Sequence, residues 1–280
     1  MSIPRGDDRS VQAYHDLWAR MYDSDYERKA GLYHAVTLAR LRQFLSTPRP
    51  GSVLDVGGGT GIWSDVLLRL GCPRVTLLDA SPGMLECARR RLCIAIKKGC
   101  VEVITGDVTH MDMIENDAFS LILAQGDVLS YCGSAEAGLQ EIARVAKGGA
   151  LVIVSVDGRI GRAQELLDVG DLEGARSAIH LGIAPMGNPS LSRQFSSRSF
   201  DPNELRQLVE GAGLQVVSLV GKCMLRVSVS VAQIATPAYS WLVDFELERG
   251  GDPLYLRRSR WLEVVACKPA RGRESSDSGF

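Results

Sequence analysis

The feature that most constrains the fold is a glycine-rich segment at residues 53–61, with the sequence VLDVGGGTG. A short apolar run contains Asp55 and breaks into glycines, and apolar residues then resume with helical spacing from Ile62 to Leu70. This pattern predicts a strand, a tight turn and a helix. Glycine adopts positive φ without steric cost and lets a ligand lie against the backbone. The start of the following helix offers unpaired N–H groups, so the turn suits a nucleotide-like ligand.

The spacing of the glycines distinguishes two kinds of nucleotide site. The dinucleotide fingerprint of dehydrogenases is G-x-G-x-x-G or G-x-G-x-x-A. Counting from Gly57 places Ile62 at the third position, and counting from Gly59 places Ser64 there, so neither frame matches. The pattern instead resembles the first motif of class I S-adenosylmethionine-dependent methyltransferases, acid-x-G-x-G-x-G, whose loop wraps the methionine part of the cofactor. Its members here are Asp55, Gly57, Gly59 and Gly61.

Two further acids follow predicted strands in the order that this family has. The apolar run at 75–78 ends at Asp79, where a carboxylate can accept hydrogen bonds from both ribose hydroxyls. A third strand near 101–104 leads into a turn. The resemblance implies that Asp107 binds the adenine amino group and that Val108 supports the ring. It also places Ala80 and Met84, just after the second acid, at the cofactor.

The fourth apolar run, 119–124, precedes residues that commonly touch both cofactor and acceptor in this family. Gln125 and Gly126 are therefore expected to bind the cofactor. Asp127 could orient or deprotonate an acceptor amine, or it could cap the helix that follows. The segment 144–149, RVAKGG, resembles the family's R-V-L-K-P-G-G signature without the leucine and the proline. It predicts a helix, a Lys-Gly-Gly turn and a strand over 150–156.

The resemblance implies an α/β fold with a Rossmann-like, seven-stranded, mostly parallel sheet, helices on both faces and an antiparallel last strand. Residues 1–45 are expected to form an N-terminal helical lid, 46–270 the methyltransferase domain and 271–280 a disordered tail. Insertions at about 157–199 and 228–258 are expected to build a helical cap over the carboxyl ends of the strands, where open α/β sheets bind ligands. Between them, DPNELRQLVEGAG at 201–213 predicts a helix with a capping box.

The N-terminal segment carries an aromatic stripe at helical spacing, formed by Tyr14, Trp18 and Tyr22, and a break is expected around residues 23–25. The stripe either packs on the domain or lines the pocket, in which case Tyr14 and Tyr22 contact the cofactor. A general base is needed only where the acceptor is protonated at working pH. The candidates beside Asp127 are Tyr14, His15 and His180, the last of which could equally be a structural histidine.

Composition narrows the class of partner. The formal net charge is −1 with no long basic tract, which disfavours a nucleic-acid substrate. The seven cysteines are odd in number and contain no C-x-x-C pair, which argues against a disulfide framework and a zinc site, so no metal is expected. No apolar segment is long and uninterrupted enough to predict a membrane span. A cytoplasmic protein, monomeric or homodimeric, is expected.

These features predict an enzyme that transfers a methyl group from S-adenosyl-L-methionine to nitrogen or oxygen of a small-molecule acceptor. The general pattern resembles the UbiE-like and natural-product branches of the family. Two alternatives from other classes stay open. One is an NAD-dependent Rossmann oxidoreductase, which the glycine spacing and the terminal strand pair disfavour. The other is a regulator that binds the cofactor without catalysis, because no single catalytic residue is diagnostic.

Overall fold

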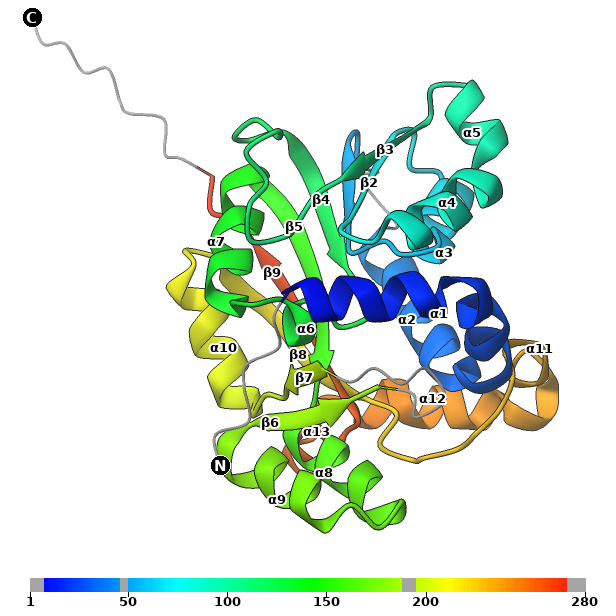
Figure 1. Cartoon of the computed structure of the whole chain (residues 1–280), viewed down its shortest axis with the longest axis vertical. Coiled ribbons are helices and arrows are strands. Elements are labelled where there is room, and N and C mark those ends of the chain that lie inside the picture. The colour runs from blue at the N-terminus through cyan, green and yellow to red at the C-terminus, as the bar shows by residue number, and fades with distance from the viewer. Residues whose placement is uncertain (1–7, 46–49, 188–194, 271–280) are drawn as a thin grey trace, which may run out of the picture.

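A seven-stranded sheet forms the centre of the computed structural model, which describes residues 8–45, 50–187 and 195–270 (Figure 1). The strands lie in the order β3 (Val101–Thr105), β2 (Val75–Asp79), β1 (Val53–Val56), β4 (Phe119–Ala124), β5 (Ala146–Asp157), β9 (Trp261–Cys267) and β8 (Gln215–Lys222). Strands β1 to β5 pair in parallel, whereas β9 is antiparallel to both of its neighbours. The predicted fold class is confirmed. The strand order reverses between β1 and β4, and such a switch point is where α/β sheets bind ligands.

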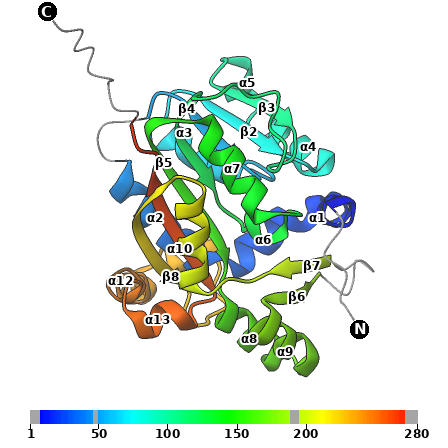
Figure 2. The ribbon, with the colours of Figure 1, turned by 90° about the vertical axis from the view of Figure 1, so that its left-hand side faces the viewer.

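Helices cover both faces of the sheet, as the apolar pattern of the strands requires. Successive side chains of a strand point to opposite faces. In β5, Val152 and Val154 pack on one side, and Ile153 packs on the other. Figure 2 shows the first side, which is covered by α7 (Ala135–Val145) and α10 (Pro202–Gly211). The second side is covered by α2 (Gly31–Phe44), α3 (Ile62–Arg69), α4 (Pro82–Arg91), α5 (Cys93–Lys97) and α12 (Ser240–Arg249).

Two local predictions have different outcomes. The helix α10 begins as expected, because Asp201 caps it and Glu204 returns the second hydrogen bond of the capping box. The Lys-Gly-Gly turn is wrong, because β5 starts at Ala146 directly after α7 and includes these residues. Gly149 has a φ of +82° and donates its N–H to the carbonyl of Lys268 at 2.7 Å. Pairing with the last part of the chain therefore draws this segment into the strand.

The N-terminal segment forms two helices, α1 (Asp8–Lys29) and α2. The break expected at residues 23–25 is wrong, because α1 continues through them and the chain is interrupted at Ala30 instead. There the backbone of Gly31 donates to the carbonyl of Val229 at 2.9 Å. A Cβ on Gly31 would lie 2.3 Å from the carbonyl oxygen of Ser230. The close passage of the second insertion thus determines where the first helix ends.

The two segments expected to be insertions each contain several short elements among their described residues. The first contains α8 (Arg159–Asp168), α9 (Leu172–Leu181), β6 (Ile183–Met186) and β7 (Phe195–Arg198). It is therefore not purely helical, because β6 and β7 pair as an antiparallel ribbon beside α1. The second insertion contains α11 (Val231–Ile234), a 3-10 turn (Pro237–Tyr239), α12 and α13 (Pro253–Arg258). The predicted tail at 271–280 lies outside the described residues.

Candidate active site

The glycine loop between β1 and α3 has the backbone that its sequence requires. Gly57, Gly59 and Gly61 have φ values of +63°, +55° and +81°, a region that other residues rarely adopt. A Cβ on Gly57 would lie 2.8 Å from Val128, and one on Gly61 would lie 2.8 Å from Leu92, so packing also demands glycine at these two positions. A Cβ on Gly59 would meet nothing within 4 Å. The backbone at Gly59 is thus open to a ligand.

Asp55, at the end of β1, has one carboxylate oxygen that is able to accept a hydrogen bond from a ligand. Its side chain is buried, and Oδ2 accepts a hydrogen bond from Ser64 Oγ at 2.6 Å. Its Oδ1 is buried without a hydrogen-bond partner in the described part of the chain. Burial raises the pKa of Asp55 to about 7. A cationic donor beside the loop, such as the amino group of a bound methionine moiety, would satisfy this oxygen.

Asp79, at the end of β2, is held in one orientation by the backbone. Its Oδ2 accepts from the N–H of Gly59, and its Oδ1 accepts from the N–H of Ser81, both at 2.8 Å. Burial raises the pKa of this carboxylate. Each oxygen keeps a second lone pair, which can accept from a hydroxyl. Ala80 is half-buried beside it, and the side chain of Met84 is buried in the first turn of α4.

Asp107 and Val108 follow β3 on the same edge of the sheet. Asp107 Oδ1 accepts from the N–H and the hydroxyl of Thr109, both at 2.7 Å, and the side chain is half-buried. Val108 is buried in the core, where it lies near Gly138 of α7. Asp107 is therefore oriented at the edge of the sheet, whereas most of the Val108 side chain packs inward.

Gln125 is committed to a buried polar network that the sequence did not predict. Its Oε1 accepts from Tyr33 at 2.9 Å and from Lys222 at 3.1 Å. Its Nε2 donates to Glu263 at 3.3 Å. The N–H of Gly126 donates to the Tyr33 hydroxyl at 3.2 Å, and a Cβ on this glycine would meet nothing within 4 Å. Gly126 is thus open on its outer side, while Gln125 holds the strand ends together.

Asp127 is buried at the carboxyl end of β4 and adopts a left-handed φ of +67°. Ser155 donates to its Oδ1 at 2.9 Å, and the indole of Trp261 donates to its Oδ2 at 2.7 Å. Its side chain makes no capping hydrogen bond to α6 (Val128–Tyr131), so the alternative role as a helix cap is wrong. Burial, together with the nearby charge of Asp157, raises the pKa of Asp127 to about 7.

The aromatic stripe of α1 faces the carboxyl ends of the strands. Tyr14 is buried and its ring centroid lies 5.3 Å from that of Phe195 in β7. The ring centroid of His15 lies 6.1 Å from that of Tyr131 in α6. Burial lowers the pKa of His15. Tyr22 is surrounded by acids, since burial and then the charges of Asp127 and Asp79 raise its pKa. The stripe is therefore packed against β7 and α6 and lies near the acids Asp79 and Asp127.

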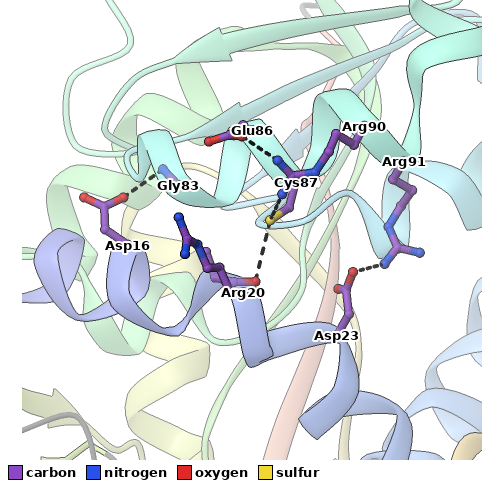
Figure 3. A pocket seen from close by; sticks show the side chains of 9 residues that line it. Asp16, Arg20, Asp23, Gly83, Glu86, Cys87, Arg90 and Arg91 are labelled. Carbon is purple, nitrogen blue, oxygen red and sulfur yellow. Dashed lines mark hydrogen bonds and ion pairs between the residues drawn. The ribbon is translucent and has the colours of Figure 1, made fainter.

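Two acids of α1, which the sequence analysis missed, hold this helix against the nucleotide motifs. Asp16 Oδ1 accepts from Ser81 Oγ at 2.6 Å and from the N–H of Gly83 at 2.9 Å, at the start of α4. Asp23 accepts from Thr60 Oγ1 at 2.6 Å and pairs with Arg91 at 2.7 Å. A groove of about 750 Å³ lies between α1 and α4 beside these contacts (Figure 3). The only signal in the sequence is that both acids recur on one face of the helix.

His180 is the one catalytic candidate that the structure does not bring to this edge. It is exposed near the end of α9, a helix that packs on α8 and β6. Figure 1 shows α9 at the far end of the first insertion from the glycine loop. The other candidates, Tyr14, His15 and Asp127, lie with the three motif acids around the carboxyl ends of β1 to β4.

The strand order, with the glycine loop and the acids at the carboxyl ends of the strands, is that of the class I S-adenosylmethionine-dependent methyltransferase fold. Residues 53–149 match the family model described as a methyltransferase domain. This part of the chain therefore resembles the methyltransferase domains that use S-adenosylmethionine as their cofactor. The open backbone at Gly59 and the unpartnered oxygen of Asp55 fit such a cofactor. Among the helices in the described ranges, none has the length and hydropathy that a bilayer span requires.

Two curated relatives share about half of the chain. The sequence is 31% identical over 151 residues to a malonyl-[acyl-carrier protein] O-methyltransferase of Serratia marcescens, covering 52% of this chain and 55% of that one. It is 35% identical over 146 residues to the ubiquinone/menaquinone biosynthesis C-methyltransferase UbiE of a Ruegeria species, covering 51% and 57%. The chain thus spans little more than half the length of the relatives it matches.

Solved structures share the fold over most of the chain. The [4+2]-cyclase SpnF has a TM-score of 0.64 at 14% identity, with 97% of this chain and 99% of that chain covered. A putative S-adenosylmethionine-dependent methyltransferase from Listeria monocytogenes has a TM-score of 0.58 at 18% identity, with 85% and 99% covered. At these identities the likeness concerns the fold alone.

Proposed function

We propose that this protein transfers a methyl group from S-adenosylmethionine to nitrogen or oxygen of a small-molecule acceptor. The observation that carries the proposal is the placement of three acids, Asp55, Asp79 and Asp107, along one edge of the sheet around an open glycine loop. They are spaced so that one acid serves each part of the cofactor: methionine, ribose and adenine. Gly59 lies between the first two acids along the chain. Its N–H donates to Asp79, and the space on its Cβ side is open.

The bound cofactor would supply an activated methyl group on a sulfonium. What remains for the protein is to orient the acceptor and exclude water, and such positioning contributes up to about 7 to 11 kcal/mol. In the proposal, α1 and the ribbon of β6 and β7 exclude water, and Tyr14 and Tyr22 line the pocket. Asp127 orients the acceptor and takes its proton. A carboxylate whose pKa is raised to about 7 by burial is suited to accept a proton near neutral pH.

The small-molecule acceptor is favoured over a macromolecule by charge and by closure. The net charge of −1 offers little attraction to a nucleic-acid backbone. The helix α1 and the strand β7 lie against each other over the site through Tyr14 and Phe195, which leaves little room for a folded protein substrate. A cytoplasmic location and a monomeric or homodimeric state belong to the same proposal.

The test must separate cofactor binding from methyl transfer, because a [4+2]-cyclase shares the fold. Calorimetric titration should show S-adenosylmethionine and S-adenosylhomocysteine binding with Kd on the order of micromolar, and no saturable binding of NADH. Gly59→Val should weaken this binding at least tenfold, because the side chain fills the open space and strains the positive φ. Gly51→Val is the matched control, since a Cβ on Gly51 also meets nothing within 4 Å.

Saturable NADH binding without any response to S-adenosylhomocysteine would overturn the proposal. Cofactor binding that is equally tight in Gly59→Val and Gly51→Val would show that the ligand does not lie on the glycine loop. Once binding is established, formation of S-adenosylhomocysteine in the presence of candidate acceptors measures transfer itself.

A further inference from the structure

A second buried carboxylate lies at the same edge as Asp127 and has no role in the account above. Asp157 is the last residue of β5 and has no exposed surface. Its N–H donates to Ser130 Oγ at 2.9 Å, and its Oδ1 pairs with Arg260. Its Oδ2 is buried and accepts no hydrogen bond from any described residue. A buried carboxylate oxygen without a donor is unfavourable, so this oxygen is suited to a donor from a ligand.

The surroundings place Asp157 with Asp127 beside an aromatic wall. Tyr131, on α6, is half-buried, and the charges of Asp157 and Asp127 are the two that raise its pKa most after desolvation. The ring of Tyr131 lies 5.4 Å from Phe195 of β7 and 6.1 Å from His15 of α1. The two carboxylates therefore lie near Tyr131, whose ring packs between the helix α1 and the inserted ribbon.

The ion pairs of this region join its cations to carboxylates other than Asp127. Arg260 is shared between Asp157 and Glu165, and Arg162 also pairs with Glu165. Lys222 and Arg40 both pair with Glu263. Arg260 and Lys222 lie near enough for their charges to lower the pKa of Asp127. Its oxygens nevertheless receive their hydrogen bonds from the neutral groups of Ser155 and Trp261. An ammonium group would complement Asp127 and Asp157 together, and aromatic faces attract cations as well.

We propose that the acceptor is an amine, bound as its ammonium ion between Asp127 and Asp157 and against the rings of Tyr131 and Phe195. The inference rests on the proposed function. The ammonium gives one proton to the carboxylate of Asp127. The neutral nitrogen then donates its lone pair to the methyl carbon while the carbon–sulfur bond breaks and its electron pair stays on sulfur. The products are the methylated ammonium ion and the neutral thioether. Asp157 positions the nitrogen.

The experiment uses the full chain saturated with S-adenosylhomocysteine and three probes of one shape. Phenethylamine carries an ammonium group, 2-phenylethanol a neutral hydroxyl and 3-phenylpropionate a carboxylate. Calorimetry should show phenethylamine binding at least tenfold more tightly than either of the others. Asp157→Asn should weaken phenethylamine binding at least tenfold and leave the Kd of S-adenosylhomocysteine within twofold of wild type. Glu165→Gln is the matched control, because it removes a carboxylate from the same arginine, and it should leave both affinities unchanged.

Failure of this inference differs from failure of the proposed function. If S-adenosylhomocysteine binds but phenethylamine binds no better than the alcohol or the acid, or does not bind, the acceptor is not an amine of this kind and the methyltransferase proposal stands. If Asp157→Asn and Glu165→Gln weaken the amine equally, Asp157 acts only through Arg260 and the inference is overturned. If S-adenosylhomocysteine itself does not bind, the proposed function fails first. Should Asp157→Asn not fold, the selectivity of the wild-type chain among the probes decides alone.

Discussion

Replacing Asp79 with asparagine tests the cofactor site at its most constrained side chain. In the structure each carboxylate oxygen accepts one backbone N–H, from Gly59 or from Ser81, and has one lone pair left. An asparagine keeps one of these oxygens and turns an NH₂ group toward the other N–H. One backbone bond and one ribose bond are therefore lost. A hydrogen bond to a charged group contributes roughly 1.5 to 3 kcal/mol, so Kd for S-adenosylhomocysteine should rise about 10- to 150-fold.

Substitution of Asp79 should also lower stability, because its carboxylate accepts hydrogen bonds from the backbone N–H groups of Gly59 and Ser81. Asp79→Ala would leave the N–H groups of both Gly59 and Ser81 unpaired, and it would destabilise the loop as well as the binding site. The asparagine variant limits this cost to one bond, so urea unfolding should show a loss on the order of 1 to 3 kcal/mol. Asp65→Asn is the control, because Asp65 pairs with Arg69 on the outer face of α3. A folded Asp79→Asn protein whose Kd stays within twofold of wild type would refute the assignment of the ribose site.

The remaining predictions concern the lid, the pH dependence and the buried network. Hydrogen exchange should slow across residues 11–26 when S-adenosylhomocysteine is added, because the ligand completes contacts of the α1 stripe. Exchange in α7 should not change. Equal protection of residues 11–26 in both states would remove Tyr14 and Tyr22 from the site. Because burial raises the pKa of Asp55 to about 7, the folded protein keeps a proton that the unfolded chain loses near pH 4. Its free energy of unfolding should therefore fall as pH rises from about 4 to about 7, by a few kcal/mol, and urea unfolding of Asp55→Asn should lack this component. Lys222→Met breaks a fully buried ion pair with Glu263 and should lower the free energy of unfolding by roughly 3 to 5 kcal/mol. Lys268→Met breaks a partly exposed pair with Asp117 and should lower it by less than about 1 kcal/mol. Equal losses of stability in urea unfolding would contradict the role of the network.

The sequence by itself determined the features that depend on neighbouring residues. The glycine turn, the acid at the end of each of the first strands and the capping box at Asp201 are all encoded within a few positions, because backbone dihedral angles and side-chain periodicity are local properties. These features were enough to indicate the fold class and the expected residues of the cofactor site.

Only the tertiary structure decided which distant side chains share the site. Gln125 meets Tyr33, Lys222 and Glu263 because β4, β5, β9 and β8 lie side by side in the sheet. The helix α1 ends at Lys29 because the next residue, Ala30, forms a β-bridge with Val229 of the second insertion. The same packing leaves Oδ2 of Asp157 without a hydrogen bond among the described residues and gives Asp127 the neutral donors Ser155 and Trp261. Such partners are selected by strand order and helix docking, which bring together residues far apart in the chain, so no local pattern carries them.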